Sequence, residues 1–229
     1  MPKPEWDKNR SFLEEGRIVL CLPIKPVSLQ ANRKKKEVVT SEIQNITSKF
    51  SFILVGDVQI DIQWQIHEQE RYESDSSADV DNILKPILDA LSGSEGVLIN
   101  DCQVQAISCH WIDWDRDEQQ ITIQIQMFGN DEWLLKDGLV FAHMGKGLCY
   151  PIVLKGIEPQ CTLDILKSLE NMLIRREELL AKGASYYHVR GIMSVQRVFH
   201  ISRVQEFNVV QLADLKAELL DKMKRDKAY

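Results

Sequence analysis

The chain of 229 residues lacks several features that would assign it to a special structural class. No segment approaches the run of about 20 apolar residues that a membrane-spanning helix requires. The first residues, Met1 to Lys8, lack the apolar stretch of a secretory signal peptide, so we expect no such leader. No internal repeat is visible. With 44% hydrophobic and 27% charged residues, the composition is that of an ordinary folded protein.

The sequence also contains no Cys-x-x-Cys pair. Its cysteines are scattered and odd in number, namely Cys21, Cys102, Cys109, Cys149 and Cys161. This usage is typical of reduced thiols, and it provides none of the paired ligands of a structural zinc site. We therefore expect a cytoplasmic protein without zinc.

A general excess of positive charge is absent too, since the net charge is −6. The charge is uneven: residues 160–229 hold 12 Lys and Arg against 9 Asp and Glu, whereas the rest of the chain holds 16 against 25. The acidic part nevertheless contains one basic run, Arg33, Lys34, Lys35 and Lys36. We interpret this run either as a solvated loop or as a set of phosphate contacts.

The most informative feature that is present is a group of acids and amides in the middle of the chain. Its members are Asp79, Asp81, Asn82, Lys85, Asp101 and Gln103. Carboxylates this close in sequence repel each other unless a cation lies among them, and a divalent metal is the obvious candidate. Simpler explanations exist for each residue: Asp79 or Asp81 caps a helix, Asp81 and Lys85 form a surface pair, or Asp101 belongs to a turn.

Apolar residues at three- and four-residue spacing predict an amphipathic helix that ends before Gly93. Pro86 is tolerated only within about the first turn of a helix, because there its missing N–H has no partner to lose. We therefore expect the helix to begin near Asp81 or later, with both aspartates on a strand end or turn.

Two blocks of this region resemble the RusA family of Holliday junction resolvases. They are Asp79-Val80-Asp81-Asn82-Ile83-Leu84-Lys85-Pro86-Ile87-Leu88-Asp89-Ala90-Leu91 and Asn100-Asp101-Cys102-Gln103-Val104. The family pattern is roughly D-x-D-N-x-x-K-x-x-x-D-A-L, a glycine-containing loop, and D-D-x-Q-V. The resemblance extends over residues 16–128 and implies an α+β fold, a small mixed β-sheet with helices packed on one face, and a homodimer.

The resemblance also implies a Mg²⁺-dependent endonuclease that resolves four-way junctions or related branched DNA, with Mn²⁺ as a possible substitute. Asp79, Asp81 and Asp101 match the metal-binding acids of the family and Lys85 matches its catalytic lysine. Asn82 and Gln103 match positions with a supporting role. The sequence departs from the family at Asn100, where an acid is common, and at 70–77, which is acidic and serine-rich instead of arginine-rich.

Alternation of apolar and polar residues predicts strands at 58–66 and 121–127. We also expect strands at 17–24 and 103–112 and a helix at 37–50. These elements form the expected nuclease domain, residues 1–130. Gly129-Asn130-Asp131 marks its end.

Residues 131–229 are expected to form a mainly helical C-terminal extension, or an α/β one, of unknown role. Helices are predicted at 162–182, capped by Thr162, and at 210–226. The segment 139–154 is apolar but irregular, and the segment 189–201 is either strand or helix.

No acidic residue occurs between Gly183 and Gln205, where Arg190, Arg197 and Arg203 alternate with aromatic residues and histidines. This pattern suits contacts with a nucleic-acid backbone and stacking on bases. The alternative is that the aromatic residues belong to the core and the arginines are solvated. The C-terminal helices also suit dimerisation or a protein partner.

Three functions compete at this point. The intact set of acids and Lys85 favours an active junction endonuclease. The acidic segment before Asp79 favours a non-catalytic protein that binds branched DNA. A protein-interaction scaffold that retains the RusA-like fold is the third.

Overall fold

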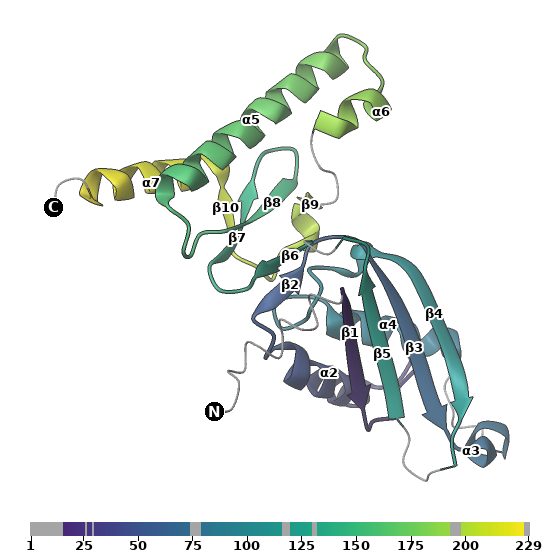
Figure 1. Ribbon diagram of the computed structural model, residues 1–229. Helices are drawn as coiled ribbons and strands as arrows, with labels where there is room; N and C mark the ends of the chain where they lie inside the picture. Colours follow the sequence, from purple (N-terminus) through teal and green to yellow (C-terminus); the bar gives the residue numbers. More distant parts are fainter. Residues whose placement is uncertain are drawn as a thin grey trace. The chain divides into compact units, whose positions relative to one another are not determined.

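The computed structural model describes residues 16–25, 27–28, 30–73, 79–115, 120–129, 132–192 and 198–226. The chain divides into two compact units, Met1–Trp133 (unit 1) and Leu134–Tyr229 (unit 2), a few residues beyond the expected boundary. Each unit has its own sheet and its own core (Figure 1). Within the described ranges no helix is long and apolar enough to cross a membrane.

The sheet of unit 1 is mixed, as the sequence predicts. Its described strands lie in the order β1, β5, β3, β4, with β5 antiparallel to both neighbours and β4 parallel to β3. Their bounds are Arg17–Leu22 for β1, Val58–Ile66 for β3, Val104–Asp113 for β4 and Gln120–Met127 for β5. The parallel pair β3 and β4 is connected through a helix, as parallel neighbours require.

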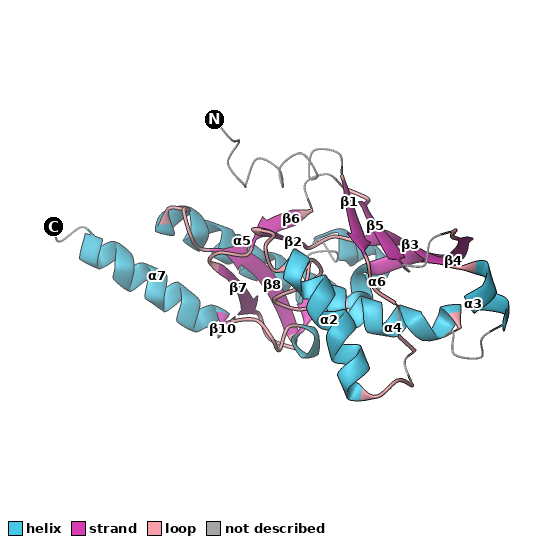
Figure 2. Cartoon of the chain, turned by 90° about the horizontal axis from the view of Figure 1, so that it is seen from below, coloured by secondary structure: helices cyan, strands magenta, loops and turns pink. Residues whose placement is uncertain are grey.

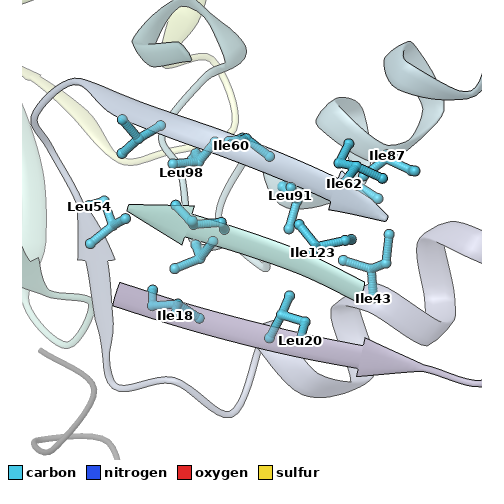
Figure 3. Close-up of a cluster of buried hydrophobic side chains, with 14 of the residues drawn as sticks. Ile18, Leu20, Ile43, Leu54, Ile60, Ile62, Ile87, Leu91, Leu98 and Ile123 are labelled. Carbon is cyan, nitrogen blue, oxygen red and sulfur yellow. The ribbon is translucent and has the colours of Figure 1, made fainter. Parts of the chain in front are cut away.

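Helices α2 (Arg33–Thr47) and α4 (Val80–Leu91) cover one face of this sheet, side by side (Figure 2). In β3 and β5 apolar and polar residues alternate, which places the branched apolar residues of these two strands on that face. Figure 3 shows the resulting core, in which Ile43 and Ile87 from the helices meet Ile62 and Ile123 from the sheet. The expected architecture, helices packed on one face of a small mixed sheet, is confirmed.

Two helix starts differ from expectation. Helix α2 begins at Arg33 instead of residue 37, because the Asn32 side chain accepts a hydrogen bond from the backbone N–H of Lys35 and caps the helix. The basic run is therefore helical, not a loop. Helix α4 begins at Val80 and keeps Pro86 in its interior. Burial of Pro86 with Ile83 and Ile87 offsets the hydrogen bond that the proline cannot donate.

Shorter elements complete unit 1. They are strand β2 (Phe52–Leu54), helix α3 (Glu68–Glu73) and the 3₁₀ turn η1 (Asp101–Gln103), while β6 (Trp133–Leu135) lies where unit 1 ends. The Trp133 ring packs edge-on against Phe52, with ring centroids 6.3 Å apart. This contact ties the last residue of unit 1 to its core.

Unit 2 contains a second sheet, as the α/β alternative for this extension requires, although most of its strands were not located from the sequence. Its described strands lie in the order β10 (Val209–Gln211), β7 (Leu139–His143), β8 (Leu148–Val153) and β9 (Phe199–His200). Strands β7 and β8 form a hairpin in the segment that was expected to be irregular. The hairpin is possible because Gly145 and Gly147 take positive φ angles of 91° and 74° in the turn.

Two long helices, α5 (Pro159–Ala181) and α7 (Leu212–Asp226), account for most regular residues of unit 2 and share one core with its sheet. The cap of α5 is Glu158, not Thr162; Thr162 is buried in the first turn and its hydroxyl donates to the carbonyl of Glu158. The segment 189–201, for which both strand and helix were expected as alternatives, lies among short helical elements. They are α6 (Tyr186–Val189), η2 (Arg190–Ile192) and η4 (Ile201–Arg203). Residues 193–197, and Arg197 with them, lie outside the described residues.

The alternation along β1 gives a stability test of unit 1. Leu20 is 3% exposed and faces the helices, whereas Val19, its neighbour, is 37% exposed. We expect Leu20→Ala to lower the free energy of unfolding by about 3 kcal/mol and Val19→Ala by less than about 1 kcal/mol. Urea unfolding followed by tryptophan fluorescence checks this, because all five tryptophans lie in residues 1–133. Equal losses in the two variants would contradict the described face of β1.

Candidate active site

The start of α4 presents two carboxylates. Asp79 is the N-cap residue, with extended backbone angles, and its carbonyl accepts a hydrogen bond from the N–H of Asn82 at 3.0 Å. Its carboxylate, however, makes no capping hydrogen bond. Asp81 lies exposed in the first turn, where the helix dipole favours a negative charge. Helix capping therefore does not account for the carboxylate of either residue.

The first turn of α4 is fixed by a small apolar cluster. Ile83 is fully buried against Trp64 and Ile66 of β3, with Trp111 of β4 packed beside them. The rings of Trp64 and Trp111 stack with centroids 4.1 Å apart. Because Ile83 lies two residues after Asp81, this cluster determines where the aspartate is presented.

Lys85, one turn further along α4, joins the two sequence blocks. Its Nζ lies 2.7 Å from an Oδ atom of Asp89 and 2.7 Å from Oδ2 of Asp101. Hydrogen bonds to Asp101 and then to Asp89 raise the pKa of Lys85, although burial opposes them. The side chain is therefore a cation at neutral pH. The surface pair considered for Asp81 and Lys85 forms instead with Asp89, a residue that sequence reasoning missed despite its i,i+4 spacing.

Asp101 is placed by the 3₁₀ turn η1, which is anchored by a buried amide. The side chain of Gln103 is 3% exposed, and its Oε1 accepts hydrogen bonds from the backbone N–H groups of Ile99 and Asn100. Its Nε2 donates to the carbonyls of Leu54 and Gly56 at 2.9 and 2.8 Å. Gln103 thus connects the turn that bears Asp101 to the segment between β2 and β3.

The chemistry of these acids fits a hard divalent cation, since carboxylate oxygens are the ligands that Mg²⁺ and Mn²⁺ prefer. In the part of the chain that the structure describes, however, no three His, Cys, Asp or Glu side chains are arranged to hold a metal ion. The positive charge beside Asp101 is the ammonium group of Lys85. The structure brings Lys85 and Asp101 together, and it leaves Asp79 and Asp81 at the helix start.

The predicted DNA-binding residues occupy separate places. Arg33, Lys34, Lys35 and Lys36 form the first turn of α2, where Arg33 pairs with Glu37 at 2.6 Å. In unit 2, Arg190 and Arg203 are exposed on η2 and η4. Of the neighbouring aromatic residues, Phe199 is buried, as the core alternative expects, whereas Tyr186 and Tyr187 are exposed.

A family model described as Endodeoxyribonuclease RusA matches residues 23–126. Residues 23–126 belong to the RusA family. The match includes both acidic blocks and Lys85. It covers β3, β4 and all of β5 except its last residue, and it ends before unit 2. The family description is that of an endodeoxyribonuclease, an enzyme that hydrolyses DNA phosphodiesters. A comparison with curated proteins found no match.

The anchoring role of Gln103 in the RusA domain gives a second test. Replacing Gln103 by Ala leaves two buried carbonyls and two N–H groups without this partner, and we expect a loss of about 3 kcal/mol in the free energy of unfolding. Gln105→Ala, a change at an exposed glutamine two residues further along in β4, is the control and should cost less than about 0.5 kcal/mol. Urea unfolding read by tryptophan fluorescence compares the two. A Gln103 variant as stable as the Gln105 variant would refute the anchor.

Proposed function

We propose that the protein is a Mg²⁺-dependent endonuclease that cleaves Holliday junctions or related branched DNA during recombination or repair. The observation that carries the proposal is the convergence of both acidic blocks of the RusA domain on Lys85, whose ammonium group contacts Asp89 and Asp101. A structural salt bridge requires only one acid. The exposed carboxylates of Asp79 and Asp81 at the start of α4 form no ion pair with a basic side chain among the described contacts, and the Asp79 carboxylate does not cap the helix.

Each residue has a distinct role in this proposal. Asp79, Asp81 and Asp101 would hold the Mg²⁺, or Mn²⁺ in its place, and the ion supplies charge neutralisation at the scissile phosphate and a more acidic water. Lys85 remains protonated and places a positive charge where negative charge develops on the transferring phosphoryl group. Gln103 keeps the turn of Asp101 in position, and Asn82 has a supporting role beside Asp81.

Symmetry supports a homodimer as the active form. A four-way junction presents two equivalent phosphodiesters, and a two-fold dimer presents two equivalent sites. A cytoplasmic location is part of the same proposal, and the five free cysteines support it.

The basic run at the start of α2 supports a contact with DNA phosphates. Four basic residues in the first turn oppose the helix dipole, which favours acids there, by about 0.3–1 kcal/mol each. Helix stability therefore does not explain them. A polyanion bound at this turn does, because it meets both the side chains and the positive end of the dipole.

A non-catalytic protein that binds branched DNA is the second candidate. The contact of Asp101 with Lys85 favours it, since that carboxylate is engaged by a side chain. The two candidates differ in one result: only the endonuclease nicks a junction when a divalent ion is supplied.

Asp81→Asn separates catalysis from binding. We expect the variant to fold and to bind a synthetic four-way junction in EDTA like the wild type, because Asp81 is exposed. Its nicking rate in Mg²⁺ should fall about a hundredfold or more, because a carboxylate ligand becomes a neutral amide. The measurements are circular dichroism, electrophoretic mobility shift and cleavage of end-labelled junction strands.

Asp115→Asn is the matched control, since Asp115 is also exposed but lies outside the acidic blocks. It should keep the wild-type nicking rate. An Asp81 variant that nicks as fast as the Asp115 variant would contradict the assignment of the metal site.

Lys34→Ala tests the basic turn. We expect weaker binding to every junction sequence and a fall of about one in the slope of log K against log salt, because one phosphate contact is lost. Lys49→Ala, an exposed lysine just beyond the opposite end of α2, should leave the slope unchanged. Fluorescence anisotropy at several salt concentrations measures both. Identical slopes for the two variants would exclude the phosphate contact.

A further inference from the structure

Unit 2 carries a helical projection that the RusA match does not cover. Helix α5 has 23 residues, so it is about 35 Å long. Its buried residues, Thr162, Leu163, Leu166 and Leu169, all lie in its first half. The turn between β7 and β8 still reaches the second half of α5, where Lys146 pairs with Glu177. Figure 1 shows the far end of α5 extending beyond the sheet of unit 2, with α6 beside it. Val189 of α6 is 2% exposed, and α6 contacts α5, so the projection is an ordered hairpin of two helices.

Two neighbouring aromatic rings are exposed at the end of this projection. Tyr187 is 74% exposed and Tyr186 is 49% exposed. Their rings meet edge to face with centroids 6.4 Å apart. Aromatic rings contribute to stability mainly through burial, which these rings largely forgo. Their exposure indicates a surface for contact with another molecule.

Arginines lie over both rings. The guanidinium group of Arg176 is 5.5 Å from the ring centroid of Tyr186, and that of Arg190 is 5.3 Å from the centroid of Tyr187. Such cation–π contacts hold the rings and the charges in one surface. The resulting combination of flat aromatic faces and guanidinium groups is the one that proteins use to bind unpaired bases and their phosphates.

The basic residues of the projection favour binding of a polyanion. No acid occurs from Leu179 to Gln205. Just before that stretch, Glu177 is paired with Lys146 and Glu178 with Arg175. Among the residues that the structure describes, Arg176, Lys182 and Arg190 form no ion pair with a carboxylate. Although Glu177 interacts electrostatically with Arg176 at longer range, the tip carries an excess of positive charge in a chain whose net charge is −6.

We propose that Tyr186 and Tyr187 form a stacking platform for unpaired bases of DNA, and that Arg176, Lys182 and Arg190 contact the adjoining phosphates. The occupant is a single-stranded segment, because the bases of an intact duplex are stacked on each other and offer no free face. This inference deepens the proposed function and rests on it only in taking branched DNA as the substrate. Branch points are where unpaired bases become accessible.

The test uses the full-length protein in EDTA, so that no strand is cut during the measurement. Fluorescence anisotropy gives the affinity for a labelled 20-nucleotide oligothymidine and for a labelled 20-base-pair duplex. The double variant Tyr186→Ala/Tyr187→Ala should bind the oligothymidine about tenfold to a hundredfold more weakly. Its affinity for the duplex should stay within about twofold of the wild type, because backbone contacts remain.

Two controls separate stacking from structural damage. Tyr186→Phe/Tyr187→Phe keeps the aromatic faces and should bind the oligothymidine within about twofold of the wild type. Leu220→Ala removes an exposed apolar side chain of α7, which is 43% exposed, and should leave both affinities unchanged. Circular dichroism and urea unfolding establish that all variants fold.

Several results would overturn the platform: no binding of oligothymidine by the wild type, an unchanged affinity in the alanine variant, or equal losses on oligothymidine and duplex. An equal loss in the phenylalanine variant would overturn it too. Cleavage of a junction in Mg²⁺ judges the proposed function separately. If the wild type nicks junctions but the alanine variant binds oligothymidine normally, only the platform is refuted. If the alanine variant loses oligothymidine binding but the wild type never nicks DNA, only the nuclease proposal is refuted.

Discussion

One cation shared between two carboxylates is the interaction on which the site depends. Lys85 contacts Asp89 on its own helix and Asp101 on a separate turn, each at 2.7 Å. The pair with Asp89 is local, whereas the pair with Asp101 joins residues that are 16 positions apart. Without this charge, the acids of the two blocks would repel each other at the place where the fold brings them together. The same charge lies next to the position where a phosphodiester is proposed to react.

The positions of these charged groups are set by buried groups that carry no charge. Ile83 fixes the first turn of α4 against Trp64, and the side chain of Gln103 makes four hydrogen bonds that hold the turn of Asp101. Ile83 packs against β3, and Gln103 donates to carbonyls of the segment that precedes β3. The sheet therefore acts as the rigid frame of the site. The acids lie outside the sheet, at the start of α4 and in the turn η1.

Regular patterns made the sheet of unit 1 and its covering helices predictable. The alternation from Val58 to Ile66 is strict, and the spacing of the acids with Lys85 identifies the family directly. Two of the errors have a common cause, since a local rule was outweighed by burial in the core. Pro86 stays inside α4 because the core buries it, and Thr162 is buried where a cap was expected.

The hairpin of β7 and β8 was missed for a related reason. Its glycines were taken as signs of irregularity, whereas the positive φ angles that they adopt are what close the turn. The partners of Lys85 were only partly predictable, because the i,i+4 rule offers Asp81 and Asp89 equally and only the fold brings Asp101 within reach. The exposure of Tyr186 and Tyr187 likewise depends on how far α5 extends beyond the sheet of unit 2. The periodicity of apolar residues in the sequence does not reveal this.

The central claim is that this RusA domain cleaves branched DNA with the help of a divalent ion. The most direct measurement compares the wild-type protein on an end-labelled four-way junction and on linear duplexes of the same sequences, in Mg²⁺ and in EDTA, with the cut positions mapped on every strand. The account predicts paired nicks at symmetric positions near the crossover, only in Mg²⁺ and only on the junction. Junction binding without nicks in Mg²⁺ or Mn²⁺, or equal cutting of the linear duplexes, would contradict it.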